Sequence, residues 1–250
     1  MVQFTVDNKK LTNFVKAFGS LNDIVFRVKD NEIEAAVGQD THYLRKRLSV
    51  ENTENGNLPI ANLTKLLAFL KATKTGNVTL NHRSKSSTVH VTSERTSLTL
   101  PTSTYLKSQS QLPLIEKLVN AGEESMWQKW AGFDLTSHGT VMGDDLQSAT
   151  YFDKVVGGKF SCKLEFDSHE MTIMAGSKVK GKMFVRAPVT DGKVKGEASY
   201  SSFAHWLPTL LETVPPGALS IHTGEETVLV IEQPDTGYLL VVMDQEYEED

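Results

Sequence analysis

The sequence of 250 residues has little of what several protein classes require. A single cysteine, Cys162, excludes a disulfide within the chain and any metal site built from several cysteines. No apolar run approaches the roughly 20 residues of a membrane-spanning helix, and the first residues, MVQFTVDNKK, lack the layout of a secretory signal. With 39% hydrophobic and 23% charged residues, the composition is typical of a globular protein. These features favour an intracellular protein.

Catalytic motifs are also missing. There is no P-loop, no G-x-S-x-G and no histidine pair at metal-ligand spacing. The strongest cluster is His138 with Asp144 and Asp145, which a metal-dependent nucleic-acid enzyme could use. Neighbouring residues of a helix point about 100° apart, however, and carboxylates are favoured in a first helical turn by the helix dipole. We therefore expect no catalytic residue, no metal site and no cofactor.

The charge is unevenly distributed along the chain. Residues 1–110 contain 15 Lys and Arg against 9 Asp and Glu, a formal charge of +6. Residues 111–250 contain 11 against 22, a formal charge of −11. A basic half on an acidic protein is compatible with a polyanionic partner bound to one surface, although charged faces are commonly just solvated.

Most segments have the pattern of short strands, among them 2–6, 23–28, 32–37 and 43–50, with a tight turn at Asp30-Asn31. Four segments have helical spacing instead. The first runs from Asn8, the expected cap, to Gly19, and the second is ANLTKLLAFLKAT, capped by Asn62. The third lies around 143–153. The fourth is SSFAHWLPTLLETV (201–214), in which we expect Pro208 to produce a kink.

The sequence contains an internal duplication. The helical stripe Leu63, Leu66, Leu67, Leu70 recurs 140 residues later as Phe203, Trp206, Leu207, Leu210. Three further blocks recur in the same order: 76–80 as 217–221, 87–91 as 227–231, and 32–38 as 170–176. We expect one unit of strands and two helices, used twice. A simple carbohydrate- or peptide-binding β domain would not explain this repeat.

Three stretches resemble the proliferating cell nuclear antigen family of sliding clamps: GNLPIANLTKLLAFLKAT (56–73), GQDTHYL (38–44) and PDTGYLLVVMDQEYEED (234–250). The resemblance implies an α+β DNA-clamp fold. In it, two topologically similar domains carry antiparallel sheets outside and two helices inside, and subunits assemble into a ring. The implied divisions are an N-terminal domain (1–104), a connector (105–125) and a C-terminal domain with an acidic tail (126–250).

The implied function is to encircle duplex DNA and to tether the replicative DNA polymerase and other DNA enzymes for processive synthesis. The helices of the first domain then supply the DNA-binding residues Lys9, Lys10, Lys16, Lys65, Lys71 and Lys74. Lysines suit sequence-independent binding, because phosphates carry the affinity without reading bases. The second domain departs from the family, since its third helix contains Asp144, Asp145 and Asp153.

The family also binds short peptide motifs of its partners. Carried over by position, the peptide pocket here comprises Thr41, Tyr43, Leu44, Leu112, Leu114, Val242 and Met243. This predicts that the apolar strand at 239–243 leaves side chains exposed. Implied partners are double-stranded DNA, a DNA polymerase, a clamp loader and further copies of the chain.

A homotrimer is expected, with edge strands near 95–101 and 178–186 paired at each joint. The alternatives are a monomeric, dimeric or hetero-oligomeric processivity factor of the same fold, and, outside this class, the metal-dependent enzyme. The expected location is with the replicating DNA.

Overall fold

The structure, a computed structural model, describes residues 1–18, 21–39, 42–103, 113, 129–130, 133–151, 155, 162–177, 181–203, 207–224 and 228–243. The chain groups into two units. Unit 1 comprises Met1–Gly38 and Arg45–Ala121, and unit 2 comprises Gln39–Leu44 and Gly122–Asp250. The expected connector lies outside the described residues except for Pro113, and so does Gly19, the expected end of the first helix.

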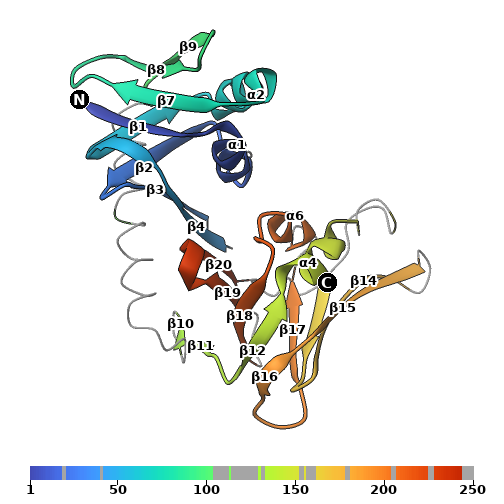
Figure 1. Ribbon diagram of the computed structural model, residues 1–250. Coiled ribbons are helices and arrows are strands. Elements are labelled where there is room, and N and C mark those ends of the chain that lie inside the picture. The colour runs from blue at the N-terminus through green and yellow to red at the C-terminus, as the bar shows by residue number, and fades with distance from the viewer. Residues whose placement is uncertain are drawn as a thin grey trace, which may run out of the picture. The chain divides into compact units, whose positions relative to one another are not determined.

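Unit 1 is built from short strands with the expected tight turn between two of them (Figure 1). Asp30 and Asn31 in this turn both have positive φ, as a two-residue hairpin loop requires. Unit 1 contains the helices α1 (Asn8–Lys16) and α2 (Leu63–Thr73). Its strands are β1 (Val2–Asp7), β2 (Asp23–Lys29), β3 (Glu32–Gln39), β4 (His42–Ser49, whose first residues group with unit 2), β5 (Glu51–Glu54), β6 (Gly56–Ala61), β7 (Asn77–His82), β8 (Thr88–Thr92) and β9 (Ser97–Pro101).

The described part of unit 2 includes strands of similar length and the short helices α4 (Gly143–Gln147) and α6 (Leu207–Leu211). A 3₁₀ turn, Ser148–Tyr151, continues α4, and another lies at Pro234–Thr236. The strands are β10 (Lys129–Trp130), β11 (Phe133–Asp134), β12 (Ser137–Met142), β13 (Cys162–Phe166), β14 (Glu170–Ser177), β15 (Gly181–Pro188), β16 (Thr190–Lys193), β17 (Ser199–Phe203), β18 (Ala218–Thr223), β19 (Val228–Gln233) and β20 (Tyr238–Met243).

The two units repeat one topology, which confirms the duplication predicted from the sequence. In unit 1 the strands pair in the orders β5-β1-β7-β8-β9 and β4-β3-β2-β6. In unit 2 the corresponding orders are β16-β12-β18-β19-β20 and β15-β14-β13-β17. Among the described residues, the strand pairs with a defined register are antiparallel, and in each unit the first helix follows its strand directly, α1 after β1 and α4 after β12.

The equivalence extends to single hydrogen bonds. The backbone N–H of Asn8, the first residue of α1, donates to the carbonyl of Gly76 at 2.9 Å. In unit 2 the N–H of Gly143, the first residue of α4, donates to the carbonyl of Gly217 at 2.8 Å. Both accepting glycines have positive φ, +82° and +89°, a conformation in which a side chain is strained. The same turn therefore anchors the first helix of each unit.

Equivalent leucines fill the two cores. Leu11 of α1 corresponds to Leu146 of α4, and both are fully buried. When Gly76 is aligned with Gly217, Leu66 and Leu70 of α2 correspond to Leu207 and Leu211 of α6. All four leucines are fully buried. The offset between α2 and α6 is thus 141 residues. The expected offset of 140 is wrong by one residue for this helix.

The fourth predicted helix is shorter than its spacing suggested. Phe203 belongs to β17, where it pairs with Cys162 of β13, and Trp206 lies outside the described residues. Pro208 is the second residue of α6. The residues directly before Leu207 lie outside the described part of the chain, so the kink at Pro208 stays a prediction.

Within the described part of the chain, no helix has the length and apolar character needed to cross a membrane.

Candidate nucleic-acid interface

Helix α1 buries an apolar face and exposes three lysines. Asp7 caps it, because its side chain accepts a hydrogen bond from the N–H of Lys10 at 3.0 Å. The buried side chains are Leu11, Phe14 and Val15, and the exposed lysines are Lys9, Lys10 and Lys16. The expectation that Asn8 is the cap is wrong. Asn8 is the first helical residue and is buried.

Helix α2 is arranged in the same way, and here the predicted cap is confirmed. The side chain of Asn62 accepts from the N–H of Lys65 at 3.2 Å. Leu63, Leu66 and Leu70 are buried, whereas Lys65 and Lys71 are exposed. Lys74, also exposed, is the residue that ends the helix, and its N–H donates to the carbonyl of Leu70.

The buried Asn8 joins the two helices. Its Nδ2 donates to Oγ1 of Thr73 at 2.6 Å, and its Oδ1 accepts from the hydroxyl of Thr12. The start of α1 therefore lies beside the end of α2, and Figure 1 shows the helices next to each other within unit 1. One end of the pair carries Lys9, Lys10, Lys71 and Lys74, and the other end carries Lys16 and Lys65.

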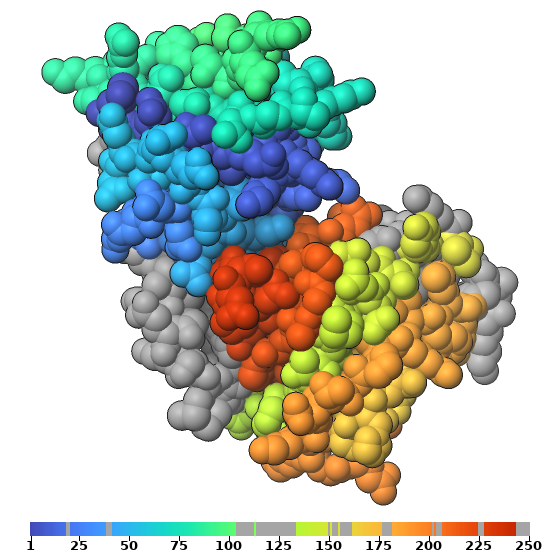
Figure 2. Space-filling view, in the orientation of Figure 1, coloured from blue at the N-terminus to red at the C-terminus, as the bar shows by residue number. Residues whose placement is uncertain are grey.

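These six lysines are available to an external anion. All six are exposed, and no ion pair to a residue that the structure describes engages any of them. In the space-filling view both helices reach the surface of unit 1, α1 in dark blue and α2 in teal (Figure 2). Unpaired ammonium groups on neighbouring helices attract a polyanion and release its counterions. An ammonium group lacks the planar, bidentate donor geometry with which the arginine guanidinium recognises base edges.

The predicted peptide-binding residues are less exposed than expected. Val242 is 0% exposed and Leu44 is 2% exposed. β20 pairs with β19 along its whole length, and its side chains from Tyr238 to Val242 are buried. The expectation of a bare apolar strand is therefore wrong. Tyr43 and Met243 are partly exposed, whereas Thr41, Leu112 and Leu114 lie outside the described residues.

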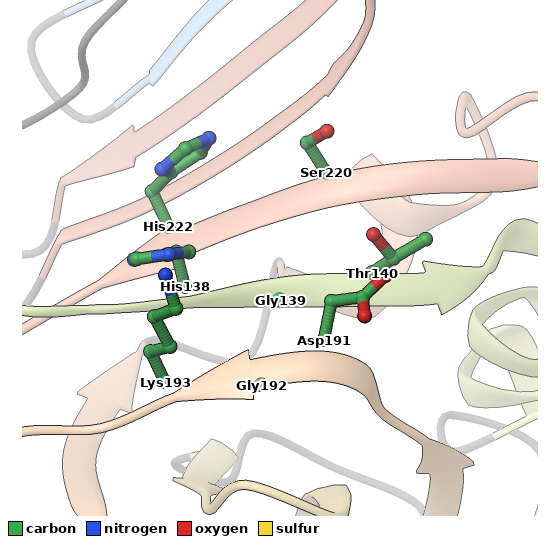
Figure 3. Close-up of a pocket in the computed structure, with 8 residues that line it drawn as sticks. All are labelled: His138, Gly139, Thr140, Asp191, Gly192, Lys193, Ser220 and His222. Carbon is green, nitrogen blue, oxygen red and sulfur yellow. The ribbon is translucent and has the colours of Figure 1, made fainter.

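The His138, Asp144 and Asp145 cluster is not brought together. His138 lies on β12 and faces His222 of β18 and Lys193 of β16, with the two imidazole centroids 6.1 Å apart (Figure 3). Partial burial of the imidazole makes the largest contribution to lowering the pKa of His138, and repulsion from His222 and Lys193 lowers it further. Asp144 lies on α4, where its carboxylate accepts from the N–H of Gly217. Among the described residues, no three His, Cys, Asp or Glu side chains are placed to hold a metal ion.

The comparisons with known proteins identify the fold. No protein-family model and no curated protein matches the chain. Among solved structures, PCNA of A. fulgidus bound to the C-terminal region of FEN-1 matches with a TM-score of 0.72 and 10% identity, over all of both chains.

Two further structures agree. PCNA from Thermococcus kodakaraensis matches with a TM-score of 0.69 and 13% identity, over 98% of this chain and all of that one. The DNA polymerase III beta subunit from Thermotoga maritima matches with a TM-score of 0.66 and 14% identity, over 99% of this chain. The chain spans only 66% of that bacterial subunit. With two units of one topology, each carrying a helix pair, the chain has the fold of the sliding clamps.

Proposed function

We propose that this chain is a subunit of a DNA sliding clamp, a processivity factor without catalytic activity of its own. The observation that supports this most directly is the set of six exposed lysines on the adjacent helices α1 and α2, which form no ion pair with any described residue, in a chain with the clamp fold. The lysines bind phosphates of any sequence, so the protein can move along the duplex while it remains associated.

The ring is formed by head-to-tail contacts between identical subunits. Two terminal strands support this proposal. Among the described strands, β9 stands at one end of its sheet in unit 1, and β15 stands at one end of its sheet in unit 2. Unpaired edges seek partners, and a head-to-tail contact that closes produces a ring. We infer a homotrimer; a monomeric, dimeric or hetero-oligomeric factor is the alternative.

The clamp tethers a DNA polymerase and other DNA enzymes, and a clamp loader places it on the replicating DNA. The A. fulgidus PCNA is solved with the C-terminal region of FEN-1, and the beta clamp of H. pylori with a DNA ligase peptide. For this chain we propose a peptide site whose contact surface includes the partly exposed Tyr43 and Met243, with the buried Leu44 and Val242 packed beneath them. Thr41, Leu112 and Leu114 complete the proposed site.

The deciding experiment combines solution mass with retention on DNA. A clamp should have a mass near three times 27.7 kDa by light scattering. It should stay on circular duplex after loading and be lost when that circle is linearised, because an open end lets a ring slide off. A monomer that is lost equally from both DNA forms would contradict the closed ring.

A separate variant distinguishes the enzyme alternative. Asp145→Ala removes one of the two adjacent carboxylates of α4 and spares Asp144, whose side chain bonds the backbone of Gly217. A clamp should keep its mass and its DNA retention. A metal-dependent nuclease should instead show activity in the unmodified protein and lose it in the variant.

A further inference from the structure

Equivalent helix positions in the two units carry opposite charge. α1 contains nine residues, 8–16, and α4 with its 3₁₀ continuation also contains nine, 143–151. The matched hydrogen bonds of Asn8 and Gly143 and the matched burial of Leu11 and Leu146 fix the alignment. Lys9 and Lys10 therefore correspond to Asp144 and Asp145, and Lys16 corresponds to Tyr151.

The second helix of each unit shows the same reversal. The paired glycines and the buried leucines align α2 with α6 at an offset of 141. Lys71 corresponds to Glu212, and both side chains are exposed. Lys74 corresponds to Pro215. The residue equivalent to Lys65 lies outside the described part of the chain.

Five of the six lysines thus have a described counterpart in unit 2, and none of these counterparts is a cation. Three are carboxylates: Asp144, Asp145 and Glu212. At the buried positions of the same helices, by contrast, the two units have the same residue type, because leucine in unit 1 corresponds to leucine in unit 2. The two copies therefore have equivalent cores but differ in charge at these helix positions, which lack in unit 2 the cations that attract a polyanion in unit 1.

We propose that duplex DNA contacts each subunit through α1 and α2 only, and that the carboxylates of α4 and of the turn after α6 keep the phosphate backbone away from unit 2. This inference rests on the proposed function and sharpens it, because it assigns the DNA-contact surface to one unit. Fewer phosphates are then neutralised per subunit than in a clamp whose helices are all basic. The salt dependence of DNA binding is correspondingly shallow.

A matched pair of crosslinking positions tests the proposal. Asn13 on α1 and Ser148 after α4 are equivalent, exposed and uncharged. Asn13→Cys and Ser148→Cys can each carry a photoactivated crosslinker on the new thiol, since the native Cys162 is buried. With clamp loaded on circular duplex, residue 13 should crosslink to DNA several-fold more efficiently than residue 148. Equal yields, or a higher yield from residue 148, would overturn the proposal.

Charge variants supply a second readout. Asp145→Lys with Glu212→Lys gives unit 2 the lysines that unit 1 has at Lys10 and Lys71, without touching Asp144. DNA affinity should rise, and each new phosphate contact should steepen the salt dependence by about 0.9 in log–log slope. The control, Glu165→Lys with Glu197→Lys, changes the net charge equally at exposed positions of β13 and the β16–β17 loop. Equal effects in the two variants would mean that only net charge matters, which overturns the proposal.

Failure of the proposed function gives a different result. If the unmodified protein shows no retention on circular DNA, the clamp assignment itself is wrong. If retention is normal but neither residue 13 nor residue 148 crosslinks, the clamp assignment survives and α1 is not the contact surface.

Discussion

Glu34 on β3 lies between arginines of the two neighbouring strands. Its Oε1 accepts from Nε of Arg45 at 2.6 Å, and its Oε2 lies 2.9 Å from Nη2 of Arg27. The side chains of Glu34 and Arg45 are about one-tenth exposed or less. A carboxylate buried to this extent is stable only with its partners, and removing one member leaves an uncompensated charge.

Glu34→Ala should therefore lower the free energy of unfolding by about 3 kcal/mol. Glu32→Ala is the matched control on the same strand, because Glu32 is half exposed and lies 3.7 Å from Arg47. It should change stability by less than about 1 kcal/mol. Urea unfolding of the two variants measures the difference, and similar losses would contradict the buried-pair interpretation.

Lys46 on β4 gives a pH-dependent prediction. Burial lowers its pKa from 10.5 to about 8. Between these values the unfolded chain binds more protons than the folded chain, so stability increases as pH rises through this window. Below pH 8 both states are protonated, and the penalty of burying the charge is fully present at pH 7.

Lys46→Met should accordingly raise the free energy of unfolding at pH 7 by about 1–3 kcal/mol. The advantage of the variant should shrink as pH is raised from 8 towards 10, because the native lysine becomes neutral in the folded state. Unfolding curves of both proteins at several pH values test this. A constant difference across the window would exclude burial as the cause.

Which single side chains are exposed could be predicted only where a local pattern decides. Helical spacing correctly separated buried Leu66 and Leu70 from exposed Lys65 and Lys71. The cap of α1 was missed because Asp7 and Asn8 are both good caps. The choice depends on Thr73, which lies 65 residues away and binds Asn8. The burial of Val242 was not predicted, because an apolar strand has the same sequence pattern whether its side chains are buried or exposed.

At the scale of elements, the two first helices begin differently. Asp7 caps α1 through its side chain, but its counterpart Met142 makes no side-chain hydrogen bond to α4 and is 46% exposed. Met142 already has the extended backbone of a capping residue, with φ −88° and ψ 129°. α4 is then an incompletely capped copy of α1, and it gives way to a 3₁₀ turn after five residues.

Met142→Ser should therefore stabilise the protein by about 0.5–1 kcal/mol, because serine can accept from the free N–H groups of the first turn. The reciprocal change, Asp7→Ala, should destabilise it by about 1 kcal/mol. Thermal unfolding of both variants provides the measurement. Destabilisation by Met142→Ser would show that the methionine makes a packing contribution larger than a cap.

Among elements, the strands were predicted well and the fourth helix was not. Strand positions follow from alternation within five or six residues, and β1, β2 and β3 lie within two residues of the expected bounds. The segment 199–211 combines an alternating stretch, SYSSF, with a helical one, LPTLL. Phe203 fits both patterns. Its pairing with Cys162 across β13 decides the outcome, and no local rule contains that information.

At the scale of the whole molecule, the proposed joint between subunits can be tested at β15. Phe184 on this terminal strand is 49% exposed, and Tyr200 on β17, at the other end of the same sheet, is 62% exposed. The registers through β14 and β13 place both rings on one face. Phe184→Glu should reduce the mass in light scattering to about that of one chain, because a charged side chain on an edge strand disfavours its pairing with a strand of another subunit. Tyr200→Glu should leave the mass unchanged.

DNA association is the second property of the whole assembly. Replacing Lys9, Lys16, Lys65 and Lys71 by alanine should weaken binding about equally across sequences and flatten its salt dependence, since each lost phosphate contact removes about 0.9 from the slope. The control replaces four exposed lysines outside the helices: Lys29, Lys85, Lys163 and Lys195. Equal losses from the two sets would make the helix lysines ordinary surface charges.

The duplication has a consequence for stoichiometry. Both copies of the unit belong to one polypeptide, so every molecule contains one lysine-bearing copy and one carboxylate-bearing copy. A clamp made from separately encoded units could vary this ratio with expression level or exclude one kind altogether. Here the ratio is one to one by covalent linkage. Mutations that alter the charge of one copy leave the other untouched, and no assembly of this chain can contain the lysine-bearing unit alone.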